Sequence, residues 1–246
     1  MTEAHGDLPL DNPMLVRWEF ASEERLGTRN AIYRRLIEGQ NAEDLLLDAV
    51  VAAAPKNVLE VGCGAGEMAQ LITRELDCQF VAIDISERMA ALTRARGIEV
   101  VLGDVQALPF DDAVFDCVVA GWVFYHVADR NRALAECARV LRPGGSLITA
   151  TLADENLADL WEYVGLSGER SLTFSTVNGA EQLARHFEHV DTYQADGVVV
   201  FPSPAAMRQF IAADITRAHA AANVPDFELP FRARSHHTVF VATKAG

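Results

Sequence analysis

The sequence of 246 residues has few basic residues, few cysteines and no long apolar run. Its 21 Lys and Arg are outnumbered by 35 Asp and Glu, which gives a formal net charge of −14 at pH 7. Such a surface repels phosphate backbones, so we expect no nucleic-acid partner. No apolar segment approaches the roughly 20 residues that a membrane-spanning helix needs, so we expect no membrane partner either.

The four cysteines, Cys63, Cys78, Cys117 and Cys137, form no C-x-x-C pair and lie in apolar or glycine-rich surroundings. We therefore expect reduced thiols in the core, without a disulfide framework and without a bound metal. The N-terminal stretch MTEAHGDLPLDNPM lacks the basic and apolar regions of a signal peptide. These features predict a cytoplasmic location.

Apolar residues are abundant, at 50% of the chain, which is enough for the core of one α/β domain. Residues 1–14 are polar and are predicted to be a loose tail, and LRPGG at 141–145 a turn. The predicted strands are 57–61, 79–84, 98–103, 115–121, 146–152, 189–201 with a break near Gly197, and 237–244. The predicted helices are 22–38, 42–53, 66–76, 87–96, 130–141, 154–165, 178–187 and one that begins after Ser203. Strands that alternate with helices indicate a mostly parallel sheet with helices on both faces.

The stretch VLEVGCGAGEMA (58–69) is an apolar strand, three glycines and the start of a helix. Glycines at such a turn let a ligand approach the backbone closely. The spacing is G-x-G-x-G, whereas the dinucleotide fingerprint would place its third glycine at Glu67. Glu60 and Glu67 flank the turn, where they disfavour a pyrophosphate and suit a ligand with a cationic group. An NAD-type site is therefore the less favoured interpretation.

Two more acids end the next predicted strands. Asp84, 22 residues beyond Gly62, can accept hydrogen bonds from both hydroxyls of a ribose. Asp104 can accept one from an adenine amino group. In chain order Glu60, Asp84 and Asp104 would address an amino acid, a ribose and a base, which matches S-adenosylmethionine better than NAD.

The motifs VLEVGCGAGEMA, FVAIDISERMAALTRARG, VVLGDVQALPFDDAVFDCVVA, YHV and RALAECARVLRPGGSLI follow one another at regular intervals. Together they resemble class I S-adenosylmethionine-dependent methyltransferases of the small-molecule type 11 group, over about Val58 to Ile148. The resemblance implies an α/β, Rossmann-like fold with a seven-stranded, mostly parallel sheet in the order 3-2-1-4-5-7-6 and the last strand antiparallel. It also implies one domain over 1–246, with a tail and lid helix (1–40), a cofactor-binding core (41–153), and the rest of the sheet with substrate-cap helices (154–246).

The resemblance further implies S-adenosylmethionine as cofactor and S-adenosylhomocysteine as product. The residues expected to bind the cofactor are Glu60, Gly62, Cys63, Gly64, Asp84, Ile85, Met89, Asp104, Val105, Ala120 and Trp122. Acceptor or lid candidates are Arg29, Tyr33, Tyr125 and Trp161. His126 is a candidate general base, with a purely structural histidine as the competing interpretation. One of His236 and His237 is expected to point toward the site.

The predicted function is methyl transfer to an O, N or C atom of a small-molecule acceptor. Transfer from a sulfonium depends mainly on the alignment of nucleophile, methyl carbon and sulfur, so it does not require an obvious base. Two alternatives stay open: a methyltransferase that acts on protein or RNA, and a non-catalytic scaffold that retains the cofactor fold. The sequence fixes neither the acceptor nor the oligomeric state.

Overall fold

The computed structural model describes residues 9–21, 24–168 and 170–246 of the chain. The strands are β1 (Ile37–Gly39), β2 (Asn57–Val61), β3 (Gln79–Asp84), β4 (Val100–Leu102), β5 (Phe115–Gly121), β6 (Leu141–Leu152), β7 (His189–Phe201) and β8 (Phe231–Thr243). The α-helices are α1 (Pro13–Glu19), α2 (Glu24–Leu36), α3 (Ala42–Ala53), α4 (Glu67–Glu75), α5 (Glu87–Ala95), α6 (Arg130–Val140), α7 (Ala158–Tyr163), α8 (Gly179–Leu183) and α9 (Pro204–Ala212). Short 3-10 helices are η1 (Val105–Ala107), η2 (Phe124–His126) and η3 (Ala218–Asn223).

Within the described residues the sheet has eight strands, in the order β1-β7-β8-β6-β5-β2-β3-β4. Strands β2 to β6 pair in parallel, whereas β8 runs antiparallel to both β6 and β7. The expectation of a Rossmann-like, mostly parallel sheet with an antiparallel last strand is thus confirmed. The expected count of seven strands is wrong, and the order differs from the expected one by the added edge strand β1.

Strand β1 forms where the sequence predicts the end of a helix, because α2 stops at Leu36 and the chain then pairs with β7. In this pairing Gly39 lies opposite Gly197. A Cβ atom at Gly197 would come within 2.7 Å of the Ile37 side chain. The sequence predicts a break near Gly197, but β7 continues through this residue. The missing side chain instead allows β1 to pack closely against β7.

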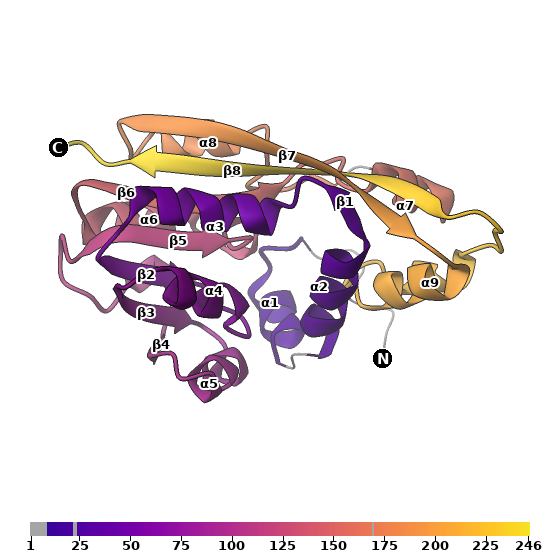
Figure 1. Cartoon of the computed structure of the whole chain (residues 1–246), viewed down its shortest axis with the longest axis horizontal. Coiled ribbons are helices and arrows are strands. Elements are labelled where there is room, and N and C mark those ends of the chain that lie inside the picture. Colours follow the sequence, from indigo (N-terminus) through magenta and orange to yellow (C-terminus); the bar gives the residue numbers. More distant parts are fainter. Residues whose placement is uncertain (1–8, 22–23, 169) are drawn as a thin grey trace.

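Helices cover both faces of the sheet (Figure 1): α3 and α4 lie on one face, α6 and α8 on the other. Alternation along β5 supplies both layers, because Val118 packs in the cluster with α6 and α8, and Val119 in the cluster with α3 and α4. A third apolar cluster joins the extended ends of β7 and β8 to α7 and α9. This third cluster, with α2 packed against it, builds one wall of the site described below.

The N-terminal segment is folded where the sequence predicts a loose tail. Helix α1 begins after Asn12, whose side-chain oxygen accepts hydrogen bonds from the backbone nitrogens of Met14 (3.0 Å) and Leu15 (3.4 Å). Pro13 takes the first helical position, where no backbone N–H is needed. The tail prediction is therefore wrong at its C-terminal end, while residues 1–8 lie outside the described residues.

Other boundaries differ more modestly. Strand β6 begins at Leu141 and includes the LRPGG segment expected as a turn, with an irregularity in its pairing to β5. Strand β8 begins at Phe231, before the predicted start at residue 237. Helices α7 and α8 are shorter than predicted. Pairing of β7 with β8 extends both strands, because each satisfies the backbone groups of the other along its whole length.

Three polar contacts hold α1 and α2 across the carboxyl ends of the parallel strands. Ser86 Oγ donates to the carbonyl of Phe20 at 2.7 Å, and Arg130 pairs with Asp11 at 3.0 Å. The guanidinium of Arg34 bridges Glu43 on α3 and Glu67 at the start of α4. The two N-terminal helices therefore cover this end of the sheet.

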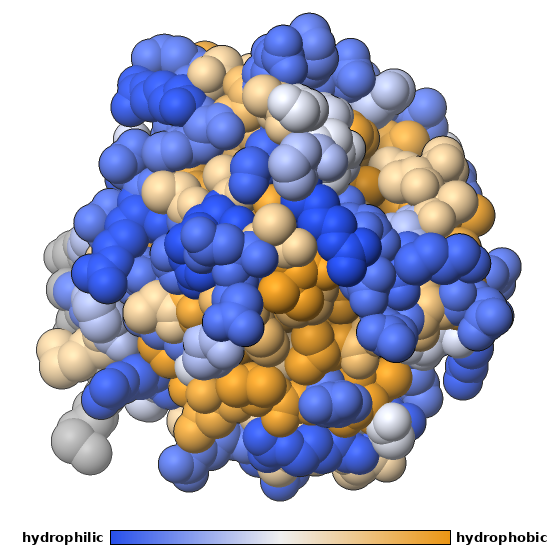
Figure 2. Space-filling model, turned by 90° about the vertical axis from the view of Figure 1, so that its left-hand side faces the viewer, coloured by the Kyte–Doolittle hydropathy of each residue, from blue (hydrophilic) through white to orange (hydrophobic). Residues whose placement is uncertain are grey.

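Figure 2 views the molecule from the opposite end, where the parallel strands begin. Hydrophilic side chains dominate this surface around a hydrophobic area in its lower centre. The four cysteines are free, and three of them are buried. In the described parts of the chain, no helix has the length and apolar character needed to cross a membrane.

Candidate cofactor and acceptor site

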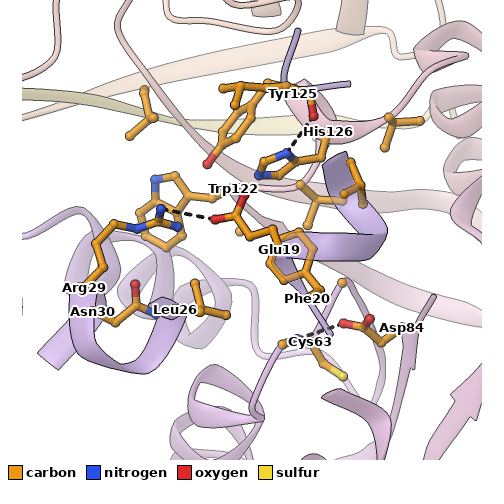
Figure 3. Close-up of a pocket in the computed structure, with 18 of the residues that line it drawn as sticks. Glu19, Phe20, Leu26, Arg29, Asn30, Cys63, Asp84, Trp122, Tyr125 and His126 are labelled. Atoms are coloured by element: carbon orange, nitrogen blue, oxygen red, sulfur yellow. Dashed lines mark hydrogen bonds and ion pairs between the residues drawn. The ribbon is translucent and has the colours of Figure 1, made fainter. Parts of the chain in front are cut away.

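A cavity of about 540 Å³ lies between the carboxyl ends of β2 to β5 and the helices α1 and α2 (Figure 3). Ligands of open α/β sheets bind at this position, and the volume is that of an ordinary small-molecule site. We call its two parts the glycine half and the aromatic half. The glycine half is lined by Glu60, Gly62, Cys63, Gly64, Asp84, Ile85, Asp104 and Val105. The aromatic half is lined by Glu19, Arg29, Tyr33, Trp122, Tyr125, His126, Trp161, Arg170, Asp214 and His237.

The glycine turn has a backbone that side chains would obstruct. Gly62 has φ +67°, and a Cβ there would lie 2.6 Å from Val123. Gly64 has φ +52°, and its backbone nitrogen donates to Asp84 Oδ2 at 2.9 Å. The other oxygen of Asp84 accepts from the backbone nitrogen of Ser86 at 2.8 Å. The carboxylate at the end of β3 thus fixes the turn that follows β2.

Glu60 is a buried carboxylate without a cationic partner in the described structure. Its side chain is 4% exposed, and Oε2 has no hydrogen-bond partner among the described residues. Burial, helped by the charge of Asp84, raises the pKa of Glu60 to about 8. Burial of an unpaired carboxylate is costly, so this wall of the cavity is suited to a ligand that brings a positive charge.

Of the other residues expected to bind the cofactor, Asp104, Val105 and Ile85 line the glycine half, whereas Met89 and Ala120 do not. Asp104 accepts from the backbone nitrogen and the side-chain amide of Gln106, both at 2.9 Å, and lines the cavity beside Val105. Ile85 is 51% exposed and borders the opening. Met89 and Ala120 are fully buried and lie outside the lining, because both face the packed interior of the protein.

A chain of hydrogen bonds forms one wall of the aromatic half. Trp122 Nε1 donates to His237 Nδ1 at 3.1 Å, so the ring hydrogen of neutral His237 sits on Nε2. That nitrogen is 3.1 Å from the hydroxyl of Tyr33, which in turn contacts Ser235 Oγ at 2.5 Å. Burial, with a smaller effect of His236, lowers the pKa of His237 to about 4, which keeps the ring neutral. His237 is thus the inward-pointing member of the predicted histidine pair.

Two ion pairs with buried carboxylates also line the aromatic half. Glu19 Oε1 pairs with Arg29 Nη1 at 3.2 Å, and Asp214 Oδ2 with Arg170 Nη2 at 2.5 Å. The charges of both pairs act on the hydroxyl of Tyr125, whose pKa is raised by burial. Burial opposes the ionisation of Asp214, but Arg170 and Arg29 outweigh it and lower the pKa of this carboxyl.

The indole of Trp161 lies beside the second of these ion pairs. The guanidinium carbons of Arg170 and Arg217 lie 5.2 and 4.7 Å from its ring centroid. These distances are within the range of cation–π contacts. Trp161 is therefore held in place by the same arginine that pairs with Asp214.

The structure brings the predicted acceptor candidates Arg29, Tyr33, Tyr125 and Trp161 to the aromatic half together with His126. Sequence reasoning missed Glu19, Arg170 and Asp214, which line the same half. These three come from segments without a recognisable motif, and no local signal distinguishes them from surface charges. Among the described residues, no group of three or more His, Cys, Asp or Glu side chains is arranged to hold a metal ion.

Comparison with known proteins agrees with this geometry. A family model described as "Methyltransferase domain" matches residues 59–149. The demethylmenaquinone methyltransferase of Thermus thermophilus is 31% identical over 176 residues, which cover 68% of this chain and 77% of that enzyme. The chain belongs to the S-adenosylmethionine-dependent methyltransferase family.

Other members of the family match shorter regions. The malonyl-[acyl-carrier protein] O-methyltransferase of Methylococcus capsulatus is 35% identical over 112 residues, which cover 43% of this chain and 41% of that enzyme. The chain spans between about a third and a little over half of the length of several such relatives. A solved SAM-dependent methyltransferase from Thermotoga maritima has a TM-score of 0.61 at 21% identity, covering 93% of this chain and 99% of that one, and so shares the fold.

Proposed function

We propose that this methyltransferase binds S-adenosylmethionine in the glycine half of the cavity and transfers its methyl group to a small molecule in the aromatic half. The observation that carries the proposal is Glu60. Its Oε2 is buried without a partner in the described chain, at the point where the cofactor's ammonium group would supply the missing cation.

The other residues of the glycine half fit the same cofactor. Asp84 retains lone pairs for the ribose hydroxyls beyond those used by Gly64 and Ser86. Asp104 and Val105 would flank the adenine, and Ile85 would cover it at the opening. When bound, the cofactor supplies a sulfonium-activated methyl group. The glycine-turn residues Gly62, Cys63 and Gly64 complete the glycine half, and Trp122 of the aromatic half would contact the cofactor from the acceptor side.

The aromatic half is built to enclose a small acceptor and exclude water. Helices α1 and α2 close it from one side, and Arg29, Tyr33, Tyr125 and Trp161 supply polar and aromatic contacts. Relatives named as a demethylmenaquinone methyltransferase and as a phthiotriol/phenolphthiotriol dimycocerosates methyltransferase support a small-molecule acceptor for this chain too. The net charge of −14 disfavours RNA as acceptor. We keep His126 as the candidate general base and the cytoplasm as the expected location.

Calorimetric titration with S-adenosylhomocysteine, with NADH in parallel, tests the proposal first. We expect the former to bind and the latter not to bind. Binding of NADH alone, or of neither compound, would contradict the cofactor assignment. Binding without methyl transfer to any compound of a broad acceptor library would favour the non-catalytic scaffold instead.

A further inference from the structure

The tautomer of His126 is fixed by the segment that precedes α1. His126 Nδ1 lies 3.1 Å from the backbone carbonyl oxygen of Leu10. A carbonyl only accepts, so Nδ1 carries the hydrogen, and in the neutral ring Nε2 keeps its lone pair. In residues 9–21, 24–168 and 170–246 no atom forms a hydrogen bond with Nε2. Figure 3 shows this nitrogen turned toward the side of the cavity where Glu19 and Tyr125 lie.

Two aromatic neighbours hold the ring in this orientation. Phe20, directly after α1, meets the His126 ring edge-on at a centroid distance of 5.4 Å. The ring of Tyr125, the preceding residue in the chain, packs against the His126 ring at a centroid distance of 4.4 Å. The ring is therefore clamped between α1 and η2 with one nitrogen facing the cavity, which is the arrangement that a proton acceptor requires.

Glu19 supplies the negative charge beside this ring. It is 2% exposed, and Figure 3 shows its carboxylate close to His126 and paired with Arg29. Burial lowers the pKa of His126, and the charge of Glu19 acts against this shift. The groups that face His126 are Glu19 from α1, Arg29 from α2, Arg170 from the segment between α7 and α8, Tyr125 from η2, and the carbonyl of Leu10.

The surrounding donors limit which acceptor atom can lie here. Arg29 and Arg170 line the same half of the cavity, and guanidinium groups only donate hydrogen bonds. Their N–H groups beyond those paired with Glu19 and Asp214 favour an atom that accepts a hydrogen bond and gives a proton to Nε2 of His126. A hydroxyl oxygen meets both conditions, since it gains negative charge as its proton leaves. The cavity also has apolar lining residues that suit the hydrophobic part of an acceptor: Leu26, Leu157, Phe210 and Ile215.

We propose that the acceptor is an alcohol or phenol, that Nε2 of His126 takes its hydroxyl proton, and that Glu19 is the positioning residue that favours the resulting imidazolium. The inference rests on the proposed function. The proton passes from the hydroxyl to Nε2 while the oxygen forms a bond to the methyl carbon. The bond from methyl carbon to sulfur breaks with its electron pair on sulfur, which leaves S-adenosylhomocysteine, and the imidazolium then loses its proton to solvent.

Nuclear magnetic resonance of protein with ¹⁵N-labelled histidine tests the base without knowledge of the acceptor. We expect His126 to be neutral at pH 7.5 with its hydrogen on Nδ1, and to titrate below pH 6.5. Glu19→Gln should lower that midpoint further, because it removes the nearby negative charge. Glu181→Gln, an exposed residue paired with Arg185, is the matched control and should leave the midpoint unchanged. A hydrogen on Nε2, or a midpoint that Glu19→Gln does not move, would overturn the proposal.

The class of acceptor is tested with a pooled library of phenols, alcohols, amines and 1,3-dicarbonyl compounds and isotope-labelled S-adenosylmethionine. O-methylated products support the proposal, whereas N- or C-methylated products overturn it. His126→Gln should lower kcat for O-methylation about 10²-fold or more and leave the affinity for S-adenosylhomocysteine nearly unchanged. The binding experiment fails separately if the proposed function itself is wrong, so the two failures are distinguishable.

Discussion

The indole nitrogen of Trp122 donates a hydrogen bond to Nδ1 of His237 across 3.1 Å, and so joins the loop after β5 to strand β8. The φ angle of Trp122 is +60°, a conformation that a residue with a bulky side chain rarely adopts. His237 also lies within hydrogen-bond distance of the hydroxyl of Tyr33 on α2. One buried imidazole therefore connects the loop after β5, strand β8 and helix α2.

Replacement of His237 should destabilise the fold. In His237→Phe the indole N–H of Trp122 loses its acceptor, and the Tyr33 hydroxyl loses a partner in a half-buried position. We expect a loss of about 1–3 kcal/mol in the free energy of unfolding, measured by urea denaturation. His189→Phe, at the exposed start of β7, is the control. Equal stability of the two variants would show that the hydrogen bonds of His237 contribute nothing.

The same histidine should make stability depend on pH in the acid range. Its pKa is about 4 in the folded protein and about 6.5 in the unfolded chain. Between these values the unfolded state binds more protons, so stability falls as pH falls, by up to about 3 kcal/mol for this group. His237→Phe should show a correspondingly shallower decline in urea titrations between pH 6.5 and 4. A decline of the same slope in both proteins would assign it to other groups.

Glu60→Gln should raise the stability of the ligand-free protein and weaken cofactor binding. The folded pKa of Glu60 is about 8, above the unfolded value of about 4.3. The folded state thus binds more protons between these values, and the contribution of Glu60 to stability declines as pH rises. At pH 7.5 the variant should be more stable by roughly 1–3 kcal/mol, and near pH 4.5 the difference should vanish.

Calorimetry should show that Glu60→Gln also loses affinity for S-adenosylhomocysteine, by about 1–3 kcal/mol. Glu99→Gln, at an exposed position before β4, should change neither stability nor affinity. A destabilised Glu60→Gln protein at pH 7.5 would contradict the assignment of Glu60 as an unpaired buried carboxylate.

Asp84→Ala should weaken the binding of S-adenosylhomocysteine by about 1–3 kcal/mol, because charge-assisted hydrogen bonds are lost. Part of the effect should come from the glycine turn, since Gly64 loses the acceptor of its backbone nitrogen. Asp84→Asn retains one accepting oxygen and should lose less. Asp77→Ala, an exposed residue before β3, is the control. Unchanged affinity of Asp84→Ala in calorimetry would refute the ribose assignment.

Alanine substitutions at Gly66 and Gly97 should distinguish the cost of backbone strain from the cost of a steric clash. Both have φ above +80°, at +81° and +83°. A Cβ at Gly66 would lie 2.8 Å from Thr93 Oγ1 and 3.1 Å from the Thr93 Cα. A Cβ at Gly97 would have no described atom within 4 Å outside its chain neighbours. Thermal and urea unfolding should therefore show a loss of about 1 kcal/mol for Gly97→Ala. For Gly66→Ala we expect about 2–4 kcal/mol, with the added cost of overpacking. Equal losses would mean that Thr93 moves aside freely.

Much of the glycine half could be predicted, because its residues lie at or directly after the ends of strands in the sequence. The run from Val58 to Val61 is buried and, apart from Glu60, apolar, and the turn that follows it is glycine-rich because side chains at Gly62 and Gly66 would clash. In a parallel sheet the acids that end β2 and β3 meet at one edge, and this places Glu60 and Asp84 together. The sequence predicts that Met89 contacts the cofactor, whereas the structure buries it fully. Helical periodicity cannot distinguish a residue that lines a cavity from one that is fully buried.

The aromatic half depended on the tertiary structure. Tyr33 and His237 are 204 residues apart in the chain, and Arg170 and Asp214 are 44 apart. No local pattern links such residues, because their contacts arise only when α2, β8 and the segment before α9 pack on the sheet. Helix α1, which brings Glu19 to His126, is a short helix that begins inside the segment predicted as a loose tail. Local chemistry therefore determined the cofactor end of this protein, and long-range packing decided which groups meet at the acceptor.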